Sequence, residues 1–380
     1  MKKQTVAFSK NSSNIFFHIL TKCNLSCRHC YINPEQHGKN TLSIDTIKEW
    51  LYLFVQSSKK SEEINVIFLG GEPTLHPDLS VAVKEARRLG VKSITIDTNG
   101  YLFHNILEKI TPDEVDFISF SLDGATEETN DFIRGKGSYK TVLEGIKKAV
   151  NLGFSTSMIY TVSSDNLHEL ALMPNLLKSL LLQDAGIERL FIQVVGIRGA
   201  SADKSAISIS ECSSSKEQTK KMDIINRQVS KDAWIKIVPK VAKEVAQLGI
   251  AVTYPKVFLE NGEEFECAGL VANNYFIFPN GRVYRCPLCE DYPIHSLEIK
   301  IPNINSKEIN SSGNGNEIVK KQCLILPTSK INESDLFELN ISEGCVMNKL
   351  IQPANLSYNL DGTPCYKIAC CMLKEEVIKS

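Results

Sequence analysis

The three cysteines nearest the N-terminus are the first residues in this sequence whose spacing indicates chemistry. Cys23, Cys27 and Cys30 form a CxxxCxxC pattern within TKCNLSCRHCY, so a single loop can wrap three thiolates around a metal centre. A structural zinc site usually takes four ligands and has no reason to leave a position open. An iron–sulfur cluster with three cysteine ligands keeps one iron for another ligand. The spacing therefore indicates an iron–sulfur cluster that binds a cofactor or a substrate.

Three more motifs each follow a short apolar run. They are GGEP at 70–73, TNG at 98–100 and SLDG at 121–124. Paired glycines let the backbone come close to a ligand, and the Glu72 carboxylate can accept hydrogen bonds from an ammonium group. Parallel βα folds place their ligand-binding loops at the carboxyl ends of the strands. We therefore expect these motifs and the cysteine loop to converge on one mouth.

Short apolar runs alternate with segments of helical period in the first half of the chain. The strands that this pattern predicts cover 14–20, 64–69, 93–97, 115–121, 156–162 and 189–195. The predicted helices cover 44–55, capped by Ser43, and then 77–89, 103–110, 142–150 and 167–182. Six βα repeats imply the α/β class, with a parallel sheet and right-handed crossovers.

The composition excludes several classes of protein. Forty-three Lys+Arg against 44 Asp+Glu give a formal charge of -1, so no strong net field indicates nucleic acid or an anionic membrane as a partner. The N-terminus lacks the apolar core of a secretory signal, and no apolar run reaches the roughly 18 residues of a membrane span. We expect a cytoplasmic protein. In that compartment its 12 cysteines are more often metal ligands than disulfides.

Most of the cysteines lie in the C-terminal third. They are Cys267, Cys286, Cys289, Cys323, Cys345, Cys365, Cys370 and Cys371. The segment YFIFPNGRVYRCPLC has two strand-like halves around Pro279-Asn280-Gly281, which predicts a β-hairpin. A polar loop at 199–222 and an amphipathic helix precede this region. We therefore expect a second, smaller and cysteine-rich domain that contains the hairpin.

The motifs and their order resemble the radical S-adenosylmethionine (radical SAM) superfamily. Its hallmark is CxxxCxΦC after the first strand, where Φ is usually aromatic and is His29 here. The resemblance implies a partial (βα)6 barrel over 1–230, a connecting helix and strand at 231–260, and an iron–sulfur domain of the SPASM or twitch type at 261–380. The later cysteines are more spread out than in a full SPASM domain, and buried free thiols or a zinc ribbon stay open there.

The resemblance also implies which residues bind the cofactors. A [4Fe-4S] cluster with an open iron would lie on Cys23, Cys27 and Cys30. At least one auxiliary iron–sulfur cluster would use ligands from the set Cys267, Cys286, Cys289, Cys345, Cys365 and Cys370. The residues implied to contact S-adenosylmethionine are His29, Tyr31, Gly70, Gly71, Glu72, Pro73, Thr98, Asn99, Ser121, Asp123, Arg134 and Gln193, with Arg198 as a further candidate.

The implied reaction is reductive cleavage of S-adenosylmethionine to a 5′-deoxyadenosyl radical, which abstracts hydrogen from a substrate. Radical SAM enzymes with SPASM or twitch extensions often oxidise or crosslink peptide or protein side chains, and this is the favoured prediction. The alternative is a dehydrogenase or rearranging enzyme that acts on a small molecule or a cofactor precursor. A reducing partner such as flavodoxin or ferredoxin is expected. A non-catalytic zinc or redox-sensing binding protein stays open until the metal content is measured.

The two metal sites can be separated by mutation. We expect a Cys286→Ala, Cys289→Ala double variant to lose roughly four irons. It should still cleave S-adenosylmethionine without substrate, because the N-terminal loop would hold the cluster that reduces the cofactor. Iron analysis and 5′-deoxyadenosine release are the measurements, and circular dichroism controls for loss of fold. Full iron content in this variant would show that these cysteines bind no cluster.

Overall fold

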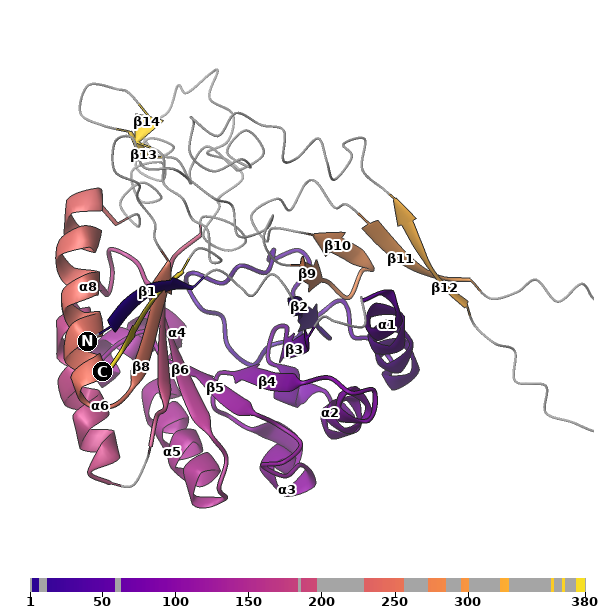
Figure 1. The fold of residues 1–380 in the computed structure, drawn as a ribbon, viewed down its shortest axis with the longest axis horizontal. Coiled ribbons are helices and arrows are strands. Elements are labelled where there is room, and N and C mark those ends of the chain that lie inside the picture. Colours follow the sequence, from indigo (N-terminus) through magenta and orange to yellow (C-terminus); the bar gives the residue numbers. More distant parts are fainter. Residues whose placement is uncertain are drawn as a thin grey trace, which may run out of the picture.

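The computed structural model describes residues 2–6, 12–58, 63–183, 186–196, 229–255, 273–284, 295–300, 322–327, 357–358, 364–365 and 374–379. Within these ranges a 13-stranded sheet forms the centre of the molecule. The strands curve into an arc, and the helices pack along its outer side (Figure 1). None of the described helices is both long and apolar enough to cross a membrane.

The middle of the sheet is parallel. Its strands are β2 (Ser12–His18), β3 (Glu63–Leu69), β4 (Ser93–Thr98), β5 (Phe117–Ser121), β6 (Thr156–Val162), β7 (Arg189–Val194), β8 (Ala251–Pro255) and β9 (Asn273–Ile277). Strands β2 to β8 pair in chain order, and β9 pairs with β2. The six predicted strands, β2 to β7, are confirmed. Strands β8 and β9 extend the parallel sheet at its two ends, which the repeat pattern did not predict.

Helices connect these strands on the outer side. They are α1 (Ile44–Ser57), α2 (Leu79–Arg88), α3 (Ile106–Lys109), α4 (Glu127–Arg134), α5 (Ser138–Asn151), α6 (Met173–Leu181) and α8 (Lys231–Gln247), with the 3-10 turns η1 (Pro73–Leu75), η2 (Phe103–Asn105) and η3 (Leu167–Leu172). Ser43 caps α1 as predicted, because its side chain accepts a hydrogen bond from Thr46 N. Helix α4 was missed, since its polar sequence EETNDFIR has a short apolar face.

Antiparallel strands extend both ends of the parallel sheet. They are β1 (Lys2–Val6) and β15 (Lys374–Ile378) beyond β8, and β10 (Arg282–Tyr284), β11 (His295–Lys300) and β12 (Gln322–Pro327) beyond β9; β13 (Ser357–Tyr358) and β14 (Pro364–Cys365) form a separate pair. Strands β9 and β10 confirm the predicted hairpin, with Val283 opposite Ile277 and Gly281 in the turn at a φ of 82°. This hairpin continues the barrel sheet through its pairing with β2.

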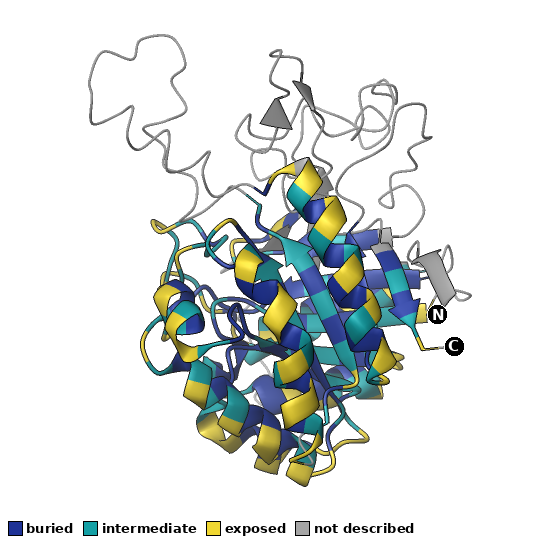
Figure 2. Cartoon of the chain, turned by 90° about the vertical axis from the view of Figure 1, so that its left-hand side faces the viewer, coloured by how far each residue is buried: buried dark blue, intermediate teal, exposed yellow. Residues whose placement is uncertain are grey.

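Alternate residues of each strand face opposite sides of the sheet. In β2, Ile15 and Phe17 join the apolar core with the helices, whose outer faces are exposed (Figure 2). The buried Asn14 lies on the other face of this strand, and its amide bonds Asn274 of β9 at 2.7 Å and Asn65 of β3 at 2.8 Å. This side-chain ladder fixes the register of β9 against β2.

A substitution at Gly100 tests how tightly α5 packs against the end of β4. A Cβ at Gly100 would lie 2.7 Å from Val142 Cα, and its φ is +92°. Gly153 has a similar φ of +83°, but a Cβ there would meet only Pro112 Cγ at 3.7 Å. We therefore expect Gly100→Ala to lower the free energy of unfolding by about 1 to 3 kcal/mol more than Gly153→Ala does. Urea unfolding followed by circular dichroism measures this difference, and equal losses would contradict the tight contact.

Candidate functional site

The cysteine loop leaves the sheet at the carboxyl end of β2. An isolated bridge between Leu20 and Thr41 closes the base of the loop. Within it Leu25 N donates to Cys23 Sγ at 3.4 Å, and Cys30 N donates to Cys27 O at 3.1 Å. None of the three thiols forms a disulfide, and all three are partly exposed. Burial raises the pKa of the Cys23 thiol to about 12, so a bound cation is needed to stabilise its thiolate.

The GGEP segment lies directly against this loop. Gly71 N donates to Leu20 O at 3.0 Å, and Glu72 N donates to Lys22 O at 2.9 Å. A Cβ at Gly71 would lie 2.1 Å from Lys22 O, so only glycine permits this approach. The two loops therefore hold each other through backbone contacts.

Glu72 ties the end of β3 to the end of β4. Its Oε1 accepts hydrogen bonds from Thr74 N, Thr74 Oγ1 and Thr98 Oγ1 at 3.1, 2.6 and 2.8 Å, and its Oε2 accepts one from Asn99 N at 2.7 Å. The residue is only 1% exposed. Burial raises the pKa of Glu72, and these four donors oppose that rise. Asn99 in turn donates from Nδ2 to Asn24 Oδ1 at 2.8 Å, which links the TNG loop to the cysteine loop.

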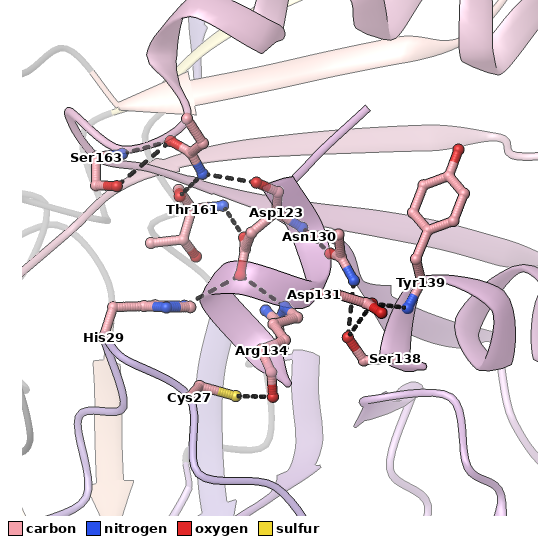
Figure 3. Close-up of polar contacts among 11 residues, drawn as sticks. Cys27, His29, Asp123, Asn130, Asp131, Arg134, Ser138, Tyr139, Thr161 and Ser163 are labelled. Atoms are coloured by element: carbon pink, nitrogen blue, oxygen red, sulfur yellow. Dashed lines mark hydrogen bonds and ion pairs between the residues drawn. The ribbon is translucent and has the colours of Figure 1, made fainter. Parts of the chain in front are cut away.

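Asp123 is the centre of a second network, at the end of β5 (Figure 3). Its Oδ2 lies 2.6 Å from Arg134 Nε and 3.1 Å from His29 Nε2, and its Oδ1 accepts from Thr161 N at 2.7 Å. The carboxylate is completely buried. Burial acts to raise its pKa, but the nearby Arg134 charge, His29 and the hydrogen bonds lower the pKa of Asp123 to about 2. Asp123 is therefore ionised and holds the cysteine loop, through His29, against α4.

Helix α4 makes further contacts with the cysteine loop. Arg28 N donates to Ile133 O at 2.9 Å, and the Cys27 thiol lies 3.9 Å from Arg134 O. Asn130 Oδ1 accepts from Asp123 N at 2.9 Å. The helix that the sequence pattern missed therefore positions both Arg134 and the second cysteine.

These loops surround a cavity of about 300 Å³ at the carboxyl ends of the parallel strands. Most of the predicted site residues line it: Cys23, Cys27, Cys30, His29, Tyr31, Gly70, Gly71, Glu72, Thr98, Asn99, Ser121, Arg134 and Gln193. The predicted convergence is thus confirmed for residues that lie up to 170 positions apart in the sequence.

The sequence model of the radical SAM superfamily matches residues 18–177. The chain contains a radical SAM domain. The matched range runs from the end of β2 into α6 and includes the cysteine loop, GGEP, TNG, SLDG and Arg134. Gln193 lies beyond it.

Relatives of this domain differ in what they act on. A probable GTP 3′,8-cyclase of Saccharolobus islandicus is 34% identical over 132 residues, which is 34% of this chain and 41% of that protein. An Fe-coproporphyrin III synthase of Methanosarcina barkeri is 29% identical over 175 residues, which is 45% of this chain and 42% of that protein. This chain therefore spans about two fifths of the length of the curated relatives that it matches.

Solved structures share the fold of the radical SAM domain. The structure of Streptococcus suis SuiB bound to S-adenosylmethionine aligns with a TM-score of 0.50 at 14% identity, over 73% of this chain and 60% of SuiB. At that identity the likeness shows the fold alone. It agrees with the partial barrel of mostly parallel strands described above.

Two predicted site residues lie behind the cavity wall of the radical SAM domain. Pro73 is buried as the first residue of η1, and Asp123 is buried beneath His29 and Arg134. Cys365 belongs to strand β14. The other residues predicted in the C-terminal third, and one candidate before it, lie outside the described residues: Arg198, Cys267, Cys286, Cys289, Cys345 and Cys370.

Sequence reasoning missed several residues that line the cavity. They are Phe16, His18, Leu69, Asp97, Ile159, Thr161 and Phe276, along with the stretch 194–196. Phe16 and His18 alternate with core residues in β2, and Thr161 does so in β6. The alternation of residues along each strand therefore already indicated which side chains near its carboxyl end face the cavity. Phe276 could not be found this way, since nothing local shows that β9 pairs with β2.

The donor set of the radical SAM domain fits an iron–sulfur cluster and S-adenosylmethionine. Three thiols that form no disulfide come from one loop, beside a cavity lined by the buried Glu72 carboxylate and the Arg134 guanidinium. Among the described residues, no group of three or more His, Cys, Asp or Glu side chains converges tightly enough for a single metal ion. Three thiolates from one loop suit a cluster with an open iron, whereas a structural zinc ion usually takes four protein ligands.

The buried pair of Asp123 and Arg134 supplies a test of the network. Asp123→Ala leaves a buried guanidinium without its partner, so we expect a loss of about 3 to 5 kcal/mol in the free energy of unfolding. The Asp123→Ala, Arg134→Ala double variant should lose less than the two single variants together. Urea unfolding measures this coupling, and additive losses would contradict it. Arg88→Ala, which breaks an exposed pair with Glu85, is the control that should change little.

The same pair predicts a pH dependence. The folded-state pKa of Asp123 is depressed to about 2, against about 4 for an unfolded aspartate. Its stabilisation is therefore present above about pH 4 and is lost as the pH falls toward 2. The stability advantage of the wild type over Asp123→Ala should shrink over that range.

Proposed function

We propose that this chain is an enzyme that cleaves S-adenosylmethionine reductively and takes a hydrogen atom from its substrate. The observation that carries the proposal is the convergence of the cysteine loop, GGEP, TNG and Arg134 on one cavity at the carboxyl ends of the strands. When bound, the cluster and S-adenosylmethionine would together supply one-electron reduction and hydrogen abstraction. The protein would hold the reactants and keep water away from them.

Cys23, Cys27 and Cys30 are the proposed ligands of the [4Fe-4S] cluster. They lie on one loop, and none of them forms a disulfide. Contacts with GGEP, Asn99 and α4 hold this loop on three sides. Such preorganisation would keep the open iron at a fixed place relative to the cavity.

Glu72 is the proposed partner of the ammonium group of S-adenosylmethionine. It is a buried carboxylate that accepts hydrogen bonds from Thr74, Thr98 and Asn99, which are all neutral donors. Its Oε2 accepts one hydrogen bond, and a carboxylate oxygen has two lone pairs. A cationic group of the ligand would therefore complete the site and offset the cost of burying this charge.

Arg134, Asn99 and Ser121 are proposed to bind the carboxylate and ribose of the cofactor. All three line the cavity. Arg134 uses Nε for Asp123, and its guanidinium carries further N–H donors that suit a carboxylate. Gln193 lines the cavity from β7 and would contact the same ligand.

An aromatic wall covers another side of the cavity. Phe16 of β2 stacks on Phe276 of β9 at 4.3 Å, and both line the cavity with His18. His18 stacks on Phe278 at 4.0 Å. We propose that this wall excludes water from the reacting atoms, as radical chemistry requires.

The substrate is proposed at the level of its class. The cysteine-rich C-terminal third, with its resemblance to SPASM and twitch regions, supports oxidation or crosslinking of a peptide or protein side chain and at least one auxiliary cluster. Two relatives, a probable GTP 3′,8-cyclase and an Fe-coproporphyrin III synthase by their names, support the second candidate, a reaction on a small molecule. Either reaction needs an external one-electron donor such as flavodoxin or ferredoxin.

The cluster ligands supply the first test of the proposal. We expect anoxically reconstituted wild type to form 5′-deoxyadenosine from S-adenosylmethionine and dithionite, and Cys27→Ala to form none, because two thiolates cannot hold the cluster in its cofactor-binding state. Cys212→Ala, which changes a cysteine outside the motif, is the matched control and should keep the activity. Wild-type yield from Cys27→Ala, or one zinc per chain with no cleavage by the wild type, would overturn the proposal.

Glu72 supplies the second test. Glu72→Gln keeps the shape of the side chain but removes the negative charge, so we expect unchanged iron content and S-adenosylmethionine binding weakened by about 2 to 3 kcal/mol. Isothermal titration on the reconstituted protein measures the dissociation constant. An unchanged constant would show that Glu72 does not face the ammonium group.

A further inference from the structure

The ring of His18 connects the hairpin of the C-terminal third to the cysteine loop. His18 is the last residue of β2, and it is buried and lines the cavity. Its imidazole stacks on Phe278, with the ring centroids 4.0 Å apart and the planes at 12°. Tyr31 meets the same imidazole in a T-shaped contact at 5.5 Å. The imidazole therefore contacts both the turn of the β9–β10 hairpin and the residue that follows Cys30.

The hairpin holds its side of this contact firmly. Phe278 N donates to Arg282 O at 3.0 Å, and Gly281 N donates to Phe278 O at 2.9 Å, so the turn fixes the backbone at Phe278. His18 Nδ1 forms a hydrogen bond with Ile277 O at 3.0 Å. The hairpin, which lies beside β2 (Figure 1), therefore holds the imidazole through one hydrogen bond and one stacked ring.

The contact between the imidazole and the hairpin is the last of three cross-strand pairs on one face of β2 and β9. Before it along the strands, Phe16 stacks on Phe276 with the ring centroids 4.3 Å apart and the planes at 8°. Before that pair, Asn14 Nδ2 donates to Asn274 Oδ1 at 2.7 Å. The hairpin cannot turn relative to β2 without disturbing all three pairs. A change at its tip is therefore passed on to the imidazole.

Tyr31 extends this chain of contacts to the GGEP segment. Its hydroxyl donates to Gly70 O at 3.1 Å. The next two backbone N–H groups of the segment donate to carbonyls of the cysteine loop. A Cβ at Gly70 would lie 2.4 Å from Leu20 O, so the segment is packed directly against the base of that loop. A displacement of Tyr31 would therefore move the backbone that carries Glu72, the proposed partner of the ammonium group.

We propose that His18 is a positioning residue that couples the β9–β10 hairpin to the S-adenosylmethionine site, because it holds Tyr31 and, through Tyr31, the backbone of the GGEP segment. This inference rests on the proposed function for the identity of the ligand. Phe278 lies outside the lining of the cavity, so it acts on the ligand only through this chain of contacts. The C-terminal third thus sets how tightly the radical SAM domain binds S-adenosylmethionine.

Hydrogen exchange tests the coupling without S-adenosylmethionine, on the full chain reconstituted under anoxic conditions. In Phe278→Ala we expect the amides of Gly71 and Glu72 to exchange at least about threefold faster than in the wild type, because their bonds to the cysteine loop would open more often. Tyr31→Phe, which lacks only the hydroxyl, should speed the same amides. Tyr275→Ala is the matched control on the opposite face of β9, where Tyr275 contacts Phe54 of α1 at 5.5 Å, and it should leave them unchanged.

Isothermal titration with S-adenosylmethionine measures the consequence for the ligand. We expect Phe278→Ala and His18→Ala each to weaken binding about fivefold, which corresponds to about 1 kcal/mol, the scale of one aromatic contact. His18→Phe can retain both ring contacts and should recover most of this loss. The Phe278→Ala, Tyr31→Phe double variant should lose less affinity than the two single losses multiplied together, because both changes interrupt the same chain. Iron content should stay at the wild-type value in each variant.

The outcomes separate this inference from the proposed function. Wild-type exchange at Gly71 and Glu72 in Phe278→Ala, or an equal rise in Tyr275→Ala, would overturn the coupling, even if the wild type binds and cleaves S-adenosylmethionine. Losses of affinity that multiply fully in the double variant would overturn it as well. Faster exchange in Phe278→Ala and Tyr31→Phe but not in the control, in a protein that does not bind S-adenosylmethionine, would support the coupling and overturn the proposed function.

Discussion

The parallel pairing of strands β2 to β7 is the constraint on which the whole site depends. Each strand ends at the same edge of the sheet, so the loops that follow must lie side by side. His18 pairs with Leu69, and Ser121 pairs with Ile159, at this edge. A slip of one residue would turn the cavity-facing side chains toward the helices. The buried apolar residues on the outer face prevent such a slip, because they would lose their contacts.

Two buried carboxylates organise the loops at this edge in different ways. Asp123 forms an ion pair with Arg134 and lies beside His29, so its charge is compensated without a ligand. Glu72 is surrounded by hydroxyl and backbone donors, so hydrogen bonds alone stabilise its charge. This difference makes the Asp123 network a scaffold that holds the cysteine loop and α4 together. It makes the Glu72 end of the cavity the place where a positively charged ligand group gains most.

Segments distant in the sequence complete both ends of the barrel. Strand β9 lies beside β2, where Asn274 and Phe276 meet Asn14 and Phe16. At the other end β15 pairs with β8 and with β1, which brings the two ends of the described chain together. The C-terminal third therefore contributes strands to the same sheet as the radical SAM domain. Through Phe276 it also contributes a wall of the cavity, so changes in that region can reach the site directly.

The sequence by itself determined the six central strands, most of the helices, the hairpin at Pro279-Asn280-Gly281 and the residues of the motifs. Those features depend on local periodicity, on caps such as Ser43 and on cysteine spacing. All of these signals come from residues that are close together in the sequence. It did not determine the pairing of Asp123 with His29, the four donors of Glu72 or the place of β9 and β15. These depend on which side chains meet after the sheet has formed, and contacts across 94 or 260 positions leave no local signal. Only the tertiary structure decided them, because burial and charge compensation act between elements rather than along the chain.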